Sequence, residues 1–103
     1  MSFTGHEDHG ISLADAAAMT KRYRNANIND SLGGFFGREF LEKLLKTSEC
    51  VGLRYYFALD DSNVLKVVLV GADQNEEDLL DDGIAEFSLA CPSHCASDNE
   101  LNS

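Results

Sequence analysis

The fold is decided by residues 51–70, which read VGLRYYFALDDSNVLKVVLV. In the first half, the odd-numbered residues from Val51 to Leu59 are large and apolar, and this period of two predicts a strand with a core face. Asp60–Asn63 has the composition of a short turn, after which Val64–Val70 returns as an antiparallel strand. Because the return strand is apolar on both faces, we expect it at the centre of a sheet.

Two helices are predicted before this hairpin. Ser12 can cap the first one, with Asp15 as its capping-box partner, and apolar spacing carries that helix to about Asn25. The second is expected to open at the glycine-rich stretch Gly33–Gly37 and to continue along a strong apolar stripe as far as Lys46.

The hairpin is followed by an acidic loop at residues 72–83 and by a third expected strand at Ile84–Leu89. The element order predicts an α+β fold in which two N-terminal helices pack on one face of a three- to four-stranded antiparallel sheet. We expect a single domain at residues 11–95. A flexible lead-in at residues 1–10 would precede it, and a disordered tail at residues 96–103 would follow.

Length and charge narrow the class of protein. The chain has 103 residues, enough for one domain, and a formal net charge of -10. All eight basic residues lie between Lys21 and Lys66. The negative overall charge, with too few lysines and arginines to replace phosphate counterions, disfavours binding to nucleic acid or to anionic membranes. No apolar run is long enough to span a bilayer, and the acidic N-terminus does not look like a secretory signal. With an odd number of cysteines, this composition predicts a cytoplasmic protein with reduced thiols.

Potential metal ligands gather near the two ends of the chain. Cys91 and Cys95 flank His94, while His6 and His9 lie in the lead-in. Free thiols are the simplest interpretation of the cysteine pair, and a zinc site and a redox disulfide stay open as alternatives. Zinc is not favoured, because three residues separate the cysteines and further ligands must come from elsewhere in the chain.

The predicted hairpin also presents a second face. Arg54, Tyr56, Lys66, Val68 and Val70 lie opposite the expected core stripe, and too little helical chain remains to cover both sides of the sheet. We therefore expect these residues to form an interface with a second copy or with a protein partner.

The sequence favours binding over catalysis. A reactive cysteine needs a nearby cation, yet residues 67–103 contain no lysine or arginine. We predict a non-catalytic binding or homo-oligomerisation module, with a metal-binding protein that uses Cys91 and Cys95 as the alternative.

Several short stretches resemble a family of small bacterial proteins to which no function is attached. They are Ile11–Leu13, Met19–Thr20, Tyr23–Arg24, Gly33–Gly37, Cys50–Tyr56, Val70–Gly71, and Cys91–Pro92 with Cys95. The resemblance extends over residues 11–95 and implies a bacterial source. It implies no activity, ligand or catalytic residue.

Overall fold

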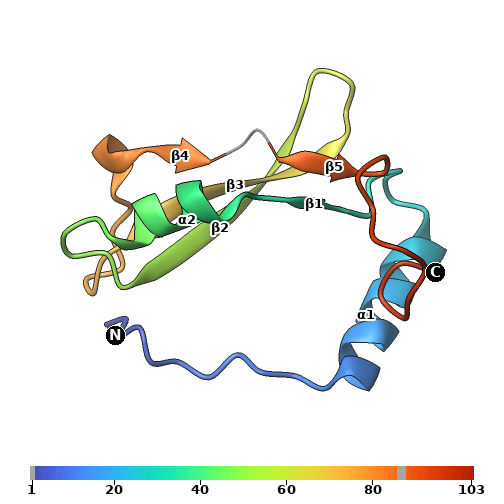
Figure 1. The fold of residues 1–103 in the computed structure, drawn as a ribbon, viewed down its shortest axis with the longest axis horizontal. Coiled ribbons are helices and arrows are strands. Elements are labelled where there is room, and N and C mark those ends of the chain that lie inside the picture. The colour runs from blue at the N-terminus through green and yellow to red at the C-terminus, as the bar shows by residue number, and fades with distance from the viewer. Residues whose placement is uncertain (1, 86–87) are drawn as a thin grey trace.

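The chain folds into a mixed α+β structure, as predicted. A computed structural model describes residues 2–85 and 88–103 (Figure 1). Its elements, in chain order, are α1 (Leu13–Ala26), β1 (Gly33–Phe35), α2 (Arg38–Leu45), β2 (Gly52–Leu59), β3 (Leu65–Ala72), the 3-10 helix η1 (Leu80–Asp82), β4 (Ile84–Ala85) and β5 (Leu89–Cys91). The strands form two antiparallel sheets, one with the order β1-β5 and one with the order β2-β3-β4.

The central hairpin is confirmed. β2 and β3 pair from Gly52 opposite Ala72 to Leu59 opposite Leu65, and β3 lies in the middle of its sheet. Asp60 closes the turn. Its backbone N–H donates to the carbonyl oxygen of Val64 at 3.1 Å, and its carboxylate accepts from the N–H of Val64 at 3.0 Å. The aspartate therefore replaces backbone partners that a tight turn leaves unpaired.

The cap of α1 is also confirmed, because Ser12 Oγ accepts a hydrogen bond from the backbone N–H of Asp15 at 3.0 Å. The packing of this helix differs from the prediction. Whereas α2 contacts β2 and β3, α1 lies beside the β1–β5 sheet and away from most of the hairpin (Figure 1). The Tyr23 hydroxyl holds α1 by donating to the carbonyl oxygen of Ser31 at 2.6 Å. The inner stripe of α1 contains Ala16 and Ala17, which offer little apolar area for packing on a sheet.

The glycine-rich stretch is divided: Gly33–Phe35 forms a strand, and only Gly37 belongs to the start of a helix, as the N-cap of α2. Gly33 pairs with Cys91 and Phe35 pairs with Leu89, so β1 finds its partner at the far end of the chain. Glycine is a poor helix former, and strand pairing satisfies its backbone groups. The third predicted strand, Ile84–Leu89, is divided between β4 and β5, and residues 86 and 87 lie outside the described part.

The buried core is small and lies around β3 and α2. Among the described residues, the buried apolar side chains are Leu44, Val70 and Ala72. The radius of gyration is 15.2 Å, whereas a compact domain of this length has roughly 13 Å. The chain by itself therefore leaves much of its apolar surface uncovered.

None of the helices in residues 2–85 and 88–103 is long and apolar enough to cross a membrane.

Candidate binding surfaces

The first candidate surface is the outer edge of β2. In an antiparallel ladder, residue pairs joined by backbone hydrogen bonds alternate with pairs that are not. The bond from the Asp60 N–H to the Val64 carbonyl oxygen marks Asp60 and Val64 as a bonded pair, so every second residue of β2 counted from Asp60 bonds to β3. The backbone groups of Leu53, Tyr55, Phe57 and Leu59 consequently face away from β3. Within the described part of the chain, β2 pairs only with β3. The eight-residue strand β2 therefore has an open edge, at which another strand can pair.

Three of the same residues also carry exposed apolar side chains. Tyr55, Phe57 and Leu59, named here the β2 row, are 59%, 73% and 62% exposed. The rings of Tyr55 and Phe57 meet edge to face, with their centroids 5.6 Å apart. The sequence pattern assigned this row to the core, and that prediction is wrong. Alternation identifies which residues share a face of a strand, but not which face other elements cover.

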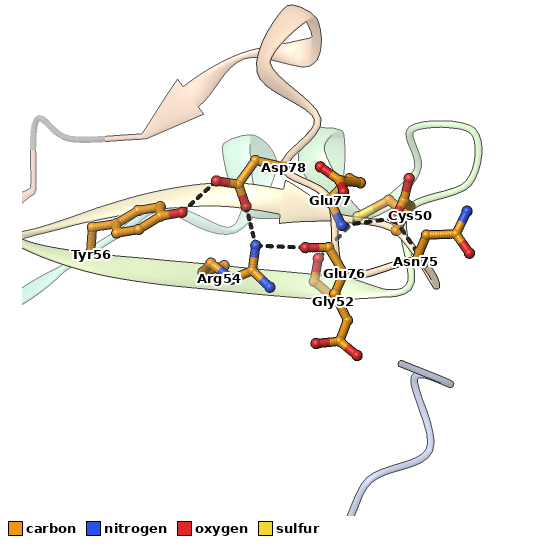
Figure 2. Close-up of polar contacts among 9 residues, drawn as sticks. Cys50, Gly52, Arg54, Tyr56, Asn75, Glu76, Glu77 and Asp78 are labelled. Atoms are coloured by element: carbon orange, nitrogen blue, oxygen red, sulfur yellow. Dashed lines mark hydrogen bonds and ion pairs between the residues drawn. The ribbon is translucent and has the colours of Figure 1, made fainter. Parts of the chain in front are cut away.

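The other face of the hairpin is occupied by a polar cluster that joins β2 to the acidic loop (Figure 2). Arg54 donates from Nη1 to a carboxylate oxygen of Asp78 and to the carbonyl oxygen of Glu76, the latter at 3.0 Å. The Tyr56 hydroxyl donates to the other carboxylate oxygen of Asp78. Asp78 is held beside β3 by its bridge to Ala72, so the cluster fixes the loop against the hairpin.

The charges in this cluster stabilise one another. Hydrogen bonds from Tyr56 and from Arg54 hold the pKa of Asp78 below its ordinary value. The same hydrogen bond to Asp78 raises the pKa of Tyr56, and Asp78 likewise raises the pKa of Arg54. The result is an ionised carboxylate, a neutral phenol and a cation at physiological pH. This is a structural ion pair rather than an acid–base pair poised for proton transfer.

The lead-in covers part of this cluster. The ring of Phe3 lies 5.4 Å from the guanidinium carbon of Arg54, and the Phe3 N–H donates to the carbonyl oxygen of Gln74 at 3.0 Å. Gly5 follows with a φ of +85°, close to the backbone of Val51. The segment around Phe3 therefore lies against the hairpin end.

The predicted interface residues are not all available on the surface. Val70 is 2% exposed and belongs to the core, which corrects its assignment to an interface. Arg54 is engaged by Asp78, and Val68 and Lys66 are half-buried. Tyr56 remains exposed although its hydroxyl is bound. The exposed apolar side chains of the hairpin lie instead on the β2 row.

A cavity of about 460 Å³ forms a second candidate surface. It lies between α1, β1 and the ends of β2 and β3 that adjoin the turn. Its apolar wall includes Met19, Tyr23, Leu32, Phe36, Phe57 and Leu65. Arg24 and Lys66 supply positive charge to its lining. Since the lining comes from four separate elements, no local pattern in the sequence indicated it.

The predicted metal ligands do not form a centre. Cys91 and Cys95 are joined as a disulfide, which was an open alternative to the favoured free thiols, and Cys50 is a free thiol. His6, His9 and His94 are all exposed. Among the described residues, no group of three histidine, cysteine or carboxylate side chains could hold a metal ion. The donor set therefore does not fit a structural zinc site, which needs four ligands.

Comparison with known proteins adds no functional information. No family model, no curated protein and no solved structure matches the chain. The resemblance to a small bacterial family stays a prediction.

Proposed function

We propose that the chain is a non-catalytic binding module that works as a homodimer, in which β2 pairs with β2 of a second copy. The observation that carries this proposal is the open edge of β2, whose outward backbone groups belong to the same residues as the exposed β2 row. Two such edges can join by backbone hydrogen bonds while their apolar side chains pack together.

The exposed area of the chain supports an interface of ordinary size. The chain exposes 7764 Å², whereas a compact monomer of 11.3 kDa exposes roughly 5,700 Å². The excess is about 2,000 Å², and a standard interface takes roughly 800 Å² from each partner. A dimer through β2 would therefore bury less than half of the surplus.

The geometry of the edge favours a second copy over an unrelated strand. An antiparallel pair of identical strands is symmetric about a two-fold axis, so every donor of one copy meets an acceptor of the other. Charge does not oppose this pairing locally, despite the net charge of -10. β2 carries a single charged residue, Arg54, and its charge is already balanced by Asp78.

Sedimentation velocity tests the proposal with a matched pair of variants. Tyr55→Lys places a charge on the edge, and Leu80→Lys makes the same charge change at a residue of η1 that is also exposed. We expect wild type and Leu80→Lys to be dimers at micromolar concentration and Tyr55→Lys to dissociate at least about tenfold more readily.

Circular dichroism would establish that both variants stay folded. A wild-type chain that remains monomeric across the concentration range would contradict the proposal. Equal dimerisation by the two variants would contradict it as well, because the edge charge would then have no effect.

A further inference from the structure

The lining of the cavity differs in charge from the rest of the molecule. The chain has 18 acidic and eight basic residues. The described residues that line the cavity nevertheless include Arg24 and Lys66 and no aspartate or glutamate. In so acidic a protein, an apolar pocket whose charged lining residues, among those described, are both basic favours an anion over a cation.

The two cations are placed differently. Arg24 donates from its terminal nitrogens to backbone oxygens of Leu101 and Ser103, the former at 2.7 Å, which fixes its guanidinium beside α1. The guanidinium is therefore held by groups of the chain itself. The side chain of Lys66, unlike its backbone, makes no hydrogen bond or ion pair with another residue in ranges 2–85 and 88–103. Its ammonium group is thus available to an incoming anion.

The shape of the cavity suits a small organic molecule. Its volume of about 460 Å³ lies within the range of roughly 300–1,000 Å³ that is usual for small-molecule sites. Three consecutive residues at the start of β3, Leu65, Lys66 and Val67, belong to its lining. A Cβ atom placed on Gly33 would meet no other atom within 4 Å, so this part of the wall is unobstructed.

We infer that this cavity binds a small amphipathic anion, with a hydrocarbon chain or ring against the apolar wall and a single carboxylate directed to the positive lining. Apolar contact supplies most of the binding, and the cations select the sign of the charge. This inference goes beyond the proposed dimer and does not depend on it, although Phe57 belongs to both surfaces.

Calorimetric titration of the full chain with three ten-carbon probes tests the selection by charge. Decanoate is the anion, decanol the neutral analogue and decyltrimethylammonium the cation. We expect decanoate to bind with a submillimolar dissociation constant, about tenfold more tightly than decanol. The cation should bind more weakly than either. No binding of decanoate, or equal binding of all three probes, would overturn the inference.

Two neighbouring positions on α1 provide matched variants. Met19→Glu adds a carboxylate to the lining of the cavity, whereas Ala18→Glu adds the same charge at an exposed residue outside the lining. The side chain of Met19 is 56% exposed, so the helix can accept the change. We expect Met19→Glu to weaken decanoate binding by about tenfold or more and Ala18→Glu to leave it nearly unchanged.

An equal effect of these two substitutions would overturn the inference, since binding would then not occur in this cavity. Sedimentation of both variants separates this result from the dimer proposal. Met19 does not lie on β2, so dimerisation should be the same in Met19→Glu as in wild type. Loss of decanoate binding without loss of the dimer is the expected result.

Discussion

Leu44 offers the sharpest test of the core. It lies on α2, is 1% exposed and packs beside Gly83, which connects η1 to β4. Replacing a fully buried leucine with alanine costs about 2.7–5 kcal/mol, because the apolar contact is lost and a cavity remains. Small domains have roughly 5–15 kcal/mol of stability in total. We therefore expect Leu44→Ala to lose a large part of the free energy of unfolding.

The neighbouring residue provides the control. Leu45 is on the same helix but is 48% exposed. Its replacement with alanine removes less buried area and slightly favours the helix, so we expect a loss of about 1 kcal/mol or less.

Urea unfolding followed by far-ultraviolet circular dichroism measures both variants. The protein concentration must be held constant, because dimerisation would add to the apparent stability. If Leu44→Ala and Leu45→Ala lowered the stability by the same amount, α2 would not bury the face described here and the reasoning would be refuted.

Two further predictions concern the lead-in and the polar cluster. Gly5→Ala should release the segment around Phe3, because the φ of Gly5 is +85° and a Cβ atom there would lie 2.9 Å from the carbonyl oxygen of Val51. Faster amide hydrogen exchange at Phe3 would show the release, and an unchanged exchange rate would contradict it. The lowered pKa of Asp78 means that its carboxylate stabilises the fold above its ordinary pKa of 3.8, and that this stability is lost as the pH falls through the lowered value. Asp78→Asn should therefore be less stable at neutral pH and lose less stability between about pH 5 and pH 2 than wild type, and parallel pH profiles of the urea midpoint would argue against this role.

The sequence was informative where local chemistry decides the structure. The hairpin follows from the apolar alternation before Asp60 and the nearly continuous apolar run after Asn63, and the start of α1 follows from Ser12 and Asp15. Each of these features depends on residues that are close together in the chain. Their physical causes, a turn and a cap, act over a few residues and leave a recognisable pattern.

The remaining features depend on distant partners. Gly33 forms a strand because Cys91 lies beside it, and no property of the glycine stretch alone indicates that partner. Arg54 and Asp78 are 24 residues apart, so their pairing also lacks a local signal. The exposure of the β2 row could not be predicted either. It depends on the position of α1, which leaves that face open, and the residue pattern of β2 gives no information about that position.

The weak attachment of α1 has a consequence for native-state fluctuations. A helix of 14 residues has marginal stability by itself in water, and it depends on tertiary contacts to stay formed. α1 has no buried residue and is tied to the rest of the chain by polar contacts such as those of Tyr23 and Arg24. We therefore expect α1 to have a low free energy of local opening and to unfold and refold while the β2–β3 hairpin stays intact.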